Sequence, residues 1–117
     1  MPRSAAAYLA DVLDACDSIV AVLRGVDLAA YQRERPSRSA VEREFMIIGE
    51  AVASLGRVDP KAAEAVSHAR LIIGFRNQLA HAYATIDDET VLSIAERDVP
   101  VLRQECEALL ETLRGAG

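Results

Sequence analysis

The spacing of the apolar residues is the feature that most restricts how this chain can fold. Along almost its whole length they recur at intervals of three and four, which places them on one face of a helix. No stretch shows convincing alternation with period two, the pattern of a half-buried strand. We therefore predict an all-α fold, an antiparallel bundle of four or five helices. The 117 residues, 51% of them hydrophobic, suffice for a single core, so residues 1–117 are expected to form one domain.

Start and stop signals bracket the first helix. Ser4 is suited to accept a hydrogen bond as the N-cap residue, and Gly25 is well placed to end the helix in a left-handed conformation. A looser segment that contains Pro36 follows. Within that segment, Asp27 is expected to cap a short turn of helix.

The second helix is predicted to begin near Ser39, with Glu42 in capping-box register, and to stop at Gly56. Its apolar residues occupy almost the full circumference, which is typical of a helix buried on more than one side. Gly49 lies in its middle, where Gly is about 1 kcal/mol less favourable than Ala. We therefore expect a close backbone crossing at Gly49. The same apolar surface is a reason to expect a symmetric homodimer.

The second half of the chain carries two further helical patterns. Asp59 followed by Pro60 is typical of a helix start, and the helical spacing then runs, with a break near Ser67, to about Tyr83. A last helix is predicted from residues 87–88 onward, and Pro100 falls inside its apolar pattern. Because proline removes a helical hydrogen bond and clashes with the preceding turn, we expect this last helix to be kinked.

Composition argues against several functional classes. No uncharged apolar run approaches the ~20 residues of a membrane span. Aspartates interrupt the apolar residues near the N-terminus, unlike the apolar region of a signal peptide. We therefore expect a cytoplasmic protein without a membrane partner. Cys16 and Cys106 lack the spacing of a zinc or redox site, so we expect two reduced, buried thiols, with no metal site and no cofactor.

The distribution of charge is more informative than its sum. The net charge of −5 argues against a protein that holds nucleic acid by bulk charge. Residues 65–84, however, contain no acidic residue, although they include Arg70, Arg76 and both histidines, His68 and His81. This stretch is the one place where the sequence favours a phosphate contact or proton transfer near neutral pH. On composition alone, a buried helix with few charges of either sign is the favoured interpretation of this stretch.

The end of the acid-free stretch has the residue types of a metal-free ribonuclease. Such an enzyme needs groups that exchange protons with the ribose 2′-OH and the leaving oxygen, and a cation for the phosphate. His81 suits the proton transfers, Arg76 the phosphate, and Asn77 the orientation of the imidazole. On an ideal helix His81 lies about 140° from Arg76, so either the arginine reaches toward the imidazole or two subunits complete the site.

The same residues carry a resemblance to a known family. Arg76, four residues, His81, one residue and Tyr83 match the motif of the HEPN superfamily, and of its HepT-like toxins in particular. Residues 40–43 and 47–51, which include Glu50, resemble that family's second helix, and residues 71–87 resemble the segment that holds the motif. The resemblance covers nearly the whole chain.

The resemblance implies a helical bundle that dimerises so that two motifs line one cleft. It implies a toxin that acts as a metal-independent RNA endonuclease, with Arg76 and His81 catalytic. It also implies an MntA-type nucleotidyltransferase antitoxin that silences the toxin by transferring AMP to Tyr83.

Each of these roles has an alternative. The lesser alternative for His81 is to end a helix by bonding a backbone carbonyl. For Arg76 it is an ion pair with Glu50, whose supporting role is then structural. Tyr83 is also suited to pack against the last helix. For the whole chain, the alternative is a non-catalytic helical adaptor that binds a nucleotide or regulates a nucleotidyltransferase. The low aromatic content of 4% and the net negative charge favour this alternative.

Overall fold

The computed structural model describes residues 3–81 and 87–115, and these form seven α-helices and no strand. The predicted all-α bundle is therefore confirmed. The helices are α1 (Ala5–Leu23), α2 (Leu28–Arg33), α3 (Arg35–Val58), α4 (Pro60–Glu64), α5 (Ala69–Ala80), α6 (Asp88–Arg97) and α7 (Val99–Gly115). Two of them, α2 and α4, have only six and five residues, which is why the structure has more helices than the pattern predicted.

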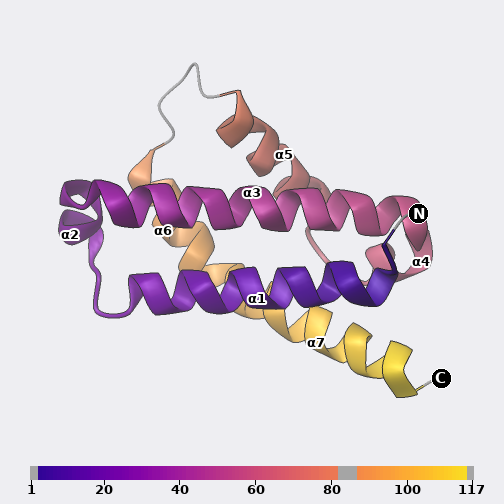
Figure 1. The fold of residues 1–117 in the computed structure, drawn as a ribbon. Helices are drawn as coiled ribbons and strands as arrows, with labels where there is room; N and C mark the ends of the chain where they lie inside the picture. Colours follow the sequence, from indigo (N-terminus) through magenta and orange to yellow (C-terminus); the bar gives the residue numbers. More distant parts are fainter. Residues whose placement is uncertain (1–2, 82–86, 116–117) are drawn as a thin grey trace.

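Helix α3 is the centre of the arrangement. It runs antiparallel to α1 along one side, and α5 lies across its other side (Figure 1). Helix α7 packs against α1, and α6 leads into α7. The apolar circumference of α3 is thus covered by several helices of its own chain, which confirms the expectation of burial on more than one side. None of the helices in the described ranges has both the length and the apolar composition needed to cross a membrane.

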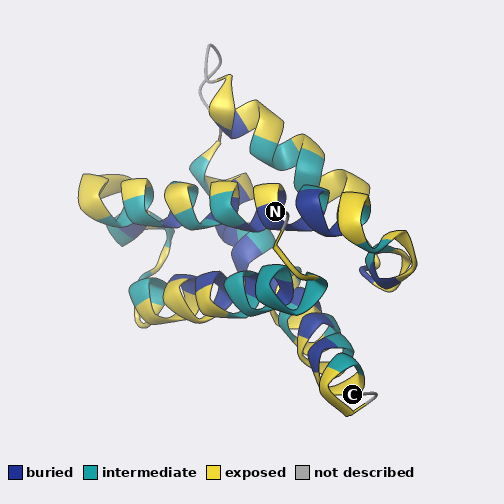
Figure 2. Cartoon of the chain, turned by 45° about the vertical axis from the view of Figure 1, so that its right-hand side comes forward, coloured by how far each residue is buried: buried dark blue, intermediate teal, exposed yellow. Residues whose placement is uncertain are grey.

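The buried side chains come mainly from α1, α3 and the α6–α7 pair, whose inward faces appear dark in Figure 2. Because they recur at helical intervals, each helix presents one stripe to the core. The largest fully buried side chains include Leu9, Val12 and Ile19 of α1, Val41, Ile48, Val52 and Leu55 of α3, and Val91 and Val99 of α6 and α7.

The predicted caps are present. The Ala7 backbone N–H donates to the Ser4 hydroxyl at 3.1 Å, and the Ala30 N–H donates to the Asp27 carboxylate at 2.8 Å. Gly25 has a φ of 72°, the left-handed conformation expected after the end of α1. The cap before Pro60 is also confirmed, because Asp59 accepts from the Ala62 N–H at 3.0 Å.

The predicted limits of the second helix were wrong at both ends. Helix α3 begins at Arg35 instead of Ser39, with Pro36 in its first turn. Proline is tolerated there because the first N–H groups of a helix have no intrahelical acceptor. Gly56 does not stop the helix, which continues to Val58 and ends where the Asp59–Pro60 pair begins the next one.

The last helical pattern is interrupted instead of bent. Helix α6 ends at Arg97, Asp98 follows, and α7 begins at Val99 with Pro100 in its first turn. The sequence located the break, but proline here begins a new helix instead of kinking a continuous one. The break near Ser67 is also present, and the Ser67 backbone N–H donates to the Glu105 carboxylate of α7 at 3.2 Å.

Gly49 lies at the close crossing that the sequence predicted. It is buried where α5 passes over α3, and a Cβ placed on it would lie 2.2 Å from the Cβ of Arg76. Two helices approach this closely only where one of them has no side chain. The unfavourable glycine in the middle of α3 is therefore explained by the position of α5.

Cys16 and Cys106 are free thiols with no exposed surface, as expected. Burial raises the pKa of each thiol from 9.0 to about 12. The two side chains behave as small core residues of α1 and α7.

We predict that both thiols resist labelling in the folded protein. With a pKa of about 12, the thiolate fraction at pH 8 is about 10⁻⁴. Ellman's reagent at pH 8 should report no fast thiol in native protein and two per chain in concentrated guanidinium chloride. Because the unfolded chain loses these protons at lower pH than the folded chain, the free energy of unfolding should fall between pH 9 and 12. Fast labelling of the native protein would contradict the burial.

Candidate functional site

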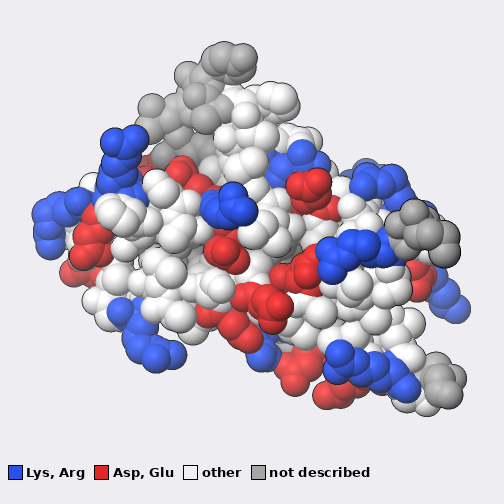
Figure 3. Space-filling view, viewed as in Figure 1, with Lys and Arg blue, Asp and Glu red and all other residues white. Residues whose placement is uncertain are grey.

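The acid-free stretch forms the turn after α4 and then helix α5, as far as the structure describes it. The surface over α5 is mostly white in Figure 3, without the mixture of charges seen on the rest of that face. The two histidines, which the sequence grouped together, stand at opposite ends of α5. His68 is the N-cap residue and His81 the C-cap residue, so a helix about 18 Å long separates them.

Arg76 is partly buried at the contact between α5 and α3. Its Cβ and Cγ lie over Gly49, and its Nε is buried without a hydrogen-bond partner among the described residues. The alternative ion pair with Glu50 is not formed: Glu50 is exposed, and no carboxylate of the described ranges lies within salt-bridge distance of Arg76. Leaving such an N–H without a partner costs about 1–3 kcal/mol.

His81 lies just outside the helix that carries Arg76. Helix α5 ends at Ala80, earlier than the predicted limit near Tyr83, because His81 leaves the helical conformation with φ −107° and ψ 45°. Its backbone N–H still donates to the Asn77 carbonyl at 3.0 Å. The angle of 140° expected from an ideal helix therefore does not apply to His81.

The side chains of Asn77 and His81 are both exposed at this end of α5. Within the part of the chain that the structure describes, neither forms a side-chain hydrogen bond, including one to Arg76 or to a backbone carbonyl. The structure thus brings Arg76, Asn77 and His81 to one end of α5 without joining them. Tyr83 lies outside the described residues.

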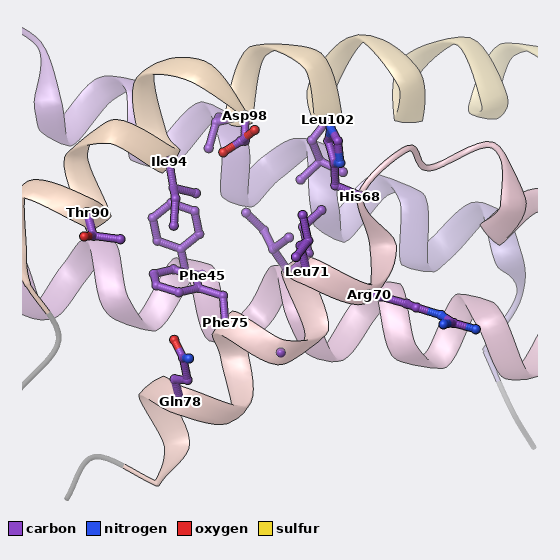
Figure 4. A pocket seen from close by; sticks show the side chains of 14 residues that line it. Phe45, His68, Arg70, Leu71, Phe75, Gln78, Thr90, Ile94, Asp98 and Leu102 are labelled. Carbon is purple, nitrogen blue, oxygen red and sulfur yellow. The ribbon is translucent and has the colours of Figure 1, made fainter. Parts of the chain in front are cut away.

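An apolar cavity of about 390 Å³ lies beside α5 and was not predicted from the sequence (Figure 4). It is bounded by α3, α5 and the α6–α7 pair, and Phe45 and Phe75 meet edge to face in its wall with ring centroids 5.1 Å apart. Leu71 stands at its mouth with 70% of its surface exposed. The sequence shows Leu71 as one more apolar residue of a helix, and only the structure shows that its side chain is exposed.

The cavity and the motif lie on different faces of α5. Phe75 and Leu71 line the cavity, whereas Arg76 does not. Arg70 is at the rim and points away from the interior in Figure 4. In residues 3–81 and 87–115, no group of three or more His, Cys, Asp or Glu side chains is arranged to hold a metal ion.

Comparisons with known proteins identify the family of this chain. The family model described as "Ribonuclease HepT-like" matches residues 12–109, which include α3, α5 and the motif. "Putative RNase MJ1216" of Methanocaldococcus jannaschii is 26% identical over 115 residues, which cover 97% of this chain and 93% of that protein.

Two further relatives are similar over comparable lengths. "Putative RNase MJ1380" of the same organism is 29% identical over 105 residues, or 90% of this chain and 95% of that protein. "Putative RNase TTE0752" of Caldanaerobacter subterraneus is 23% identical over 104 residues, or 89% and 92%. No solved structure matches significantly. Since the family model matches far more than half of the residues, this chain belongs to the HepT-like ribonuclease family.

Proposed function

We propose that this chain is a toxin that cleaves RNA without a metal ion, with Arg76 and His81 as its catalytic residues. The observation that carries the proposal is the position of Arg76, whose cation has no acidic partner in the described ranges and lies on the helix that ends at the exposed His81. RNA cleavage requires a cation for the phosphate and an accessible imidazole, and one end of α5 carries both residue types. The family and its relatives named as RNases support the same substrate.

The reaction assigns one task to each group. The imidazole of His81 removes the proton from the ribose 2′-OH, and the 2′ oxygen attacks the adjacent phosphorus. The P–O bond to the 5′ oxygen breaks, and that oxygen leaves with a proton delivered by a His81 imidazolium. The products are a cyclic phosphate and a 5′-hydroxyl. Arg76 holds the non-bridging phosphate oxygens with its planar fork, and Asn77 orients the imidazole. Glu50, exposed next to Gly49 on α3, has a structural role in this proposal and takes no part in the reaction.

A second copy of the chain completes this proposal. The sequence favoured a homodimer because of the apolar surface of α3. In the structure, other helices of the same chain cover much of that surface, so it gives less support for a dimer. Leu71 and the cavity beside it now provide a better interface. Arg70 lies on the α5 side of the cavity and Asp98 on the opposite side, so a two-fold axis that passes between them pairs opposite charges. Arg76 lies on another face of the same helix, so this contact brings the two α5 helices together without including Arg76 itself.

The proposed antitoxin is an MntA-type nucleotidyltransferase that transfers AMP to Tyr83. Tyr83 is two residues from His81, so an anionic nucleotide attached there occupies the site and repels RNA phosphates. Both partners are proposed to act in the cytoplasm, where the RNA substrate is found.

The adaptor hypothesis remains the alternative function. A cavity of about 390 Å³ with apolar walls is large enough for a partner's side chains, and the net charge of −5 disfavours broad RNA binding. It predicts a stable complex that survives the loss of His81 and no toxicity of the chain alone.

We predict that the purified protein cleaves RNA in the presence of EDTA. Arg76→Ala should lower kcat/KM about 10²- to 10³-fold, because it removes the phosphate cation. His81→Ala should lower it about 10²- to 10⁴-fold through lost proton transfer. Arg114→Ala, at an exposed arginine near the end of α7, is the control and should retain wild-type activity.

Expression of the chain alone separates the two candidate functions. Growth arrest by the wild type but not by His81→Ala supports the ribonuclease toxin. Intact RNA with both proteins, and no arrest with either, would support the adaptor.

The dimer makes a separate prediction. Light scattering at micromolar concentration should give twice the 12.6 kDa of one chain, and Leu71→Asp should return the mass to one chain. Val20→Asp, on an exposed position of α1, should leave the dimer intact. A monomeric wild type would show that the proposed contact does not form.

The proposed modification is tested by intact-mass measurement. After co-expression with the nucleotidyltransferase, the wild type should gain the mass of one or more AMP units and lose RNA cleavage, because the added phosphate repels the substrate. Tyr83→Phe should keep its original mass and its activity. An unmodified wild type under these conditions would argue against Tyr83 as the acceptor.

A further inference from the structure

We propose that Gly49 is a positioning residue for Arg76: the absence of a side chain on α3 lets α5 lie where the guanidinium reaches the site. The inference rests on the proposed role of Arg76 in catalysis. Gly49 itself does not contact the reacting groups, since it is buried beneath the stem of the arginine.

The contact between Gly49 and α5 leaves no room for a methyl group. A Cβ at Gly49 would lie 2.2 Å from the Cβ of Arg76 and 2.7 Å from its Cγ, both far inside van der Waals distance. These atoms are the base of the arginine side chain, and a rotamer change cannot move Cβ away. A substitution at Gly49 must therefore move α5 as a whole.

Backbone conformation does not explain the glycine. Gly49 lies within an α-helix, and Gly25 is the only residue of the described ranges with a positive φ. Alanine is the better helix former at such a position. What requires glycine at position 49 is thus the neighbouring helix and not the conformation of α3.

Two neighbouring contacts fix how α5 sits on α3. Phe45 and Gly49 are one turn apart on α3, and they contact the consecutive residues Phe75 and Arg76 of α5. The edge-to-face ring pair sets the rotation of α5, and Gly49 sets how closely it approaches. Together they determine where the arginine leaves the interface.

The burial of the Arg76 Nε shows how tightly the stem is enclosed. This atom has no accessible surface and no hydrogen-bond partner in the described ranges, so the stem is held by packing. An ordinary contact of 3.4–4 Å at an alanine would move the base of the stem by more than 1 Å, and a misplacement of about 1 Å at a reacting group costs about 100-fold in rate.

Helix α3 offers a matched control. Gly56 is also a helical glycine of α3, but a Cβ there would lie 3.9 Å from the Cβ of Ala63, an ordinary contact. Gly49→Ala and Gly56→Ala therefore make the same chemical change in the same helix and differ in what the new methyl group meets.

The first test is the cleavage of a defined RNA oligonucleotide in EDTA. Gly49→Ala should lower kcat about 100-fold, with a smaller change in KM, because the phosphate cation is displaced while other RNA contacts remain. Gly56→Ala should keep wild-type values. A Gly49→Ala protein with wild-type kcat would overturn the proposal.

A second pair of variants covers the case in which Gly49→Ala folds poorly. Adding Arg76→Gly removes the Cβ that the new methyl group meets, whereas adding Arg76→Ala keeps it. Gly49→Ala should therefore lower the melting temperature less in an Arg76→Gly background than in an Arg76→Ala background, each compared with its own Arg76 single variant. An equal effect of Gly49→Ala in the two backgrounds would show that the clash does not involve Arg76, and would overturn the proposal.

A spectroscopic test does not depend on RNA cleavage. The NMR signal of the Arg76 Nε–H, assigned by its loss in Arg76→Lys, should exchange slowly with water in the wild type and in Gly56→Ala. In Gly49→Ala its exchange should be about 10-fold faster or more, because the stem is no longer enclosed. If the wild type cleaves no RNA, the proposed function fails while this signal still tests the contact. If it cleaves RNA but exchange is unchanged in Gly49→Ala, only the role of Gly49 fails.

Discussion

The apolar circumference of α3 is the constraint on which the rest of the structure depends. Apart from an exposed strip that includes Met46 and Glu50, the middle of this helix is apolar and must be covered from more than one direction, and α1 and α5 pack on different sides of it. Helix α7 then covers a further side of α1. The helix is interrupted at Asp98, and this interruption separates α6 from α7. The position of α5, and therefore of the motif, depends on the space that the missing side chain of Gly49 leaves on α3.

Much of the fold was predictable because its signals are local. The caps at Ser4, Asp27 and Asp59 depend on residues three positions apart, and a sequence shows such pairs directly. The errors occurred where two local signals competed. Ser39 has the capping pattern, but a proline in the first turn allowed α3 to begin earlier, and Gly56 has no left-handed turn to make.

The candidate site was predictable in its residues but not in its geometry. The motif identified Arg76 and His81 as candidate residues, and a close helix crossing at Gly49 was also predicted. That the same glycine supports the stem of Arg76 could not be predicted, because it depends on the register between two helices. The alternative pairing of Arg76 with Glu50 is absent for the same reason, and the length of α5 separates His68 from His81. The cavity beside Leu71 exists because α5 packs mainly on α3 and leaves a space before α6 and α7.

Helix α5 has only one buried residue, Leu79, whereas each of the long helices α1, α3 and α7 buries several. The helix that bears the motif thus contributes little to the core. Its outward positions are free to change without loss of stability, provided that the contacts with Gly49 and Phe45 remain. In such an arrangement the surface around the motif can diverge among relatives, and with it the RNA or partner recognised, while one scaffold is retained.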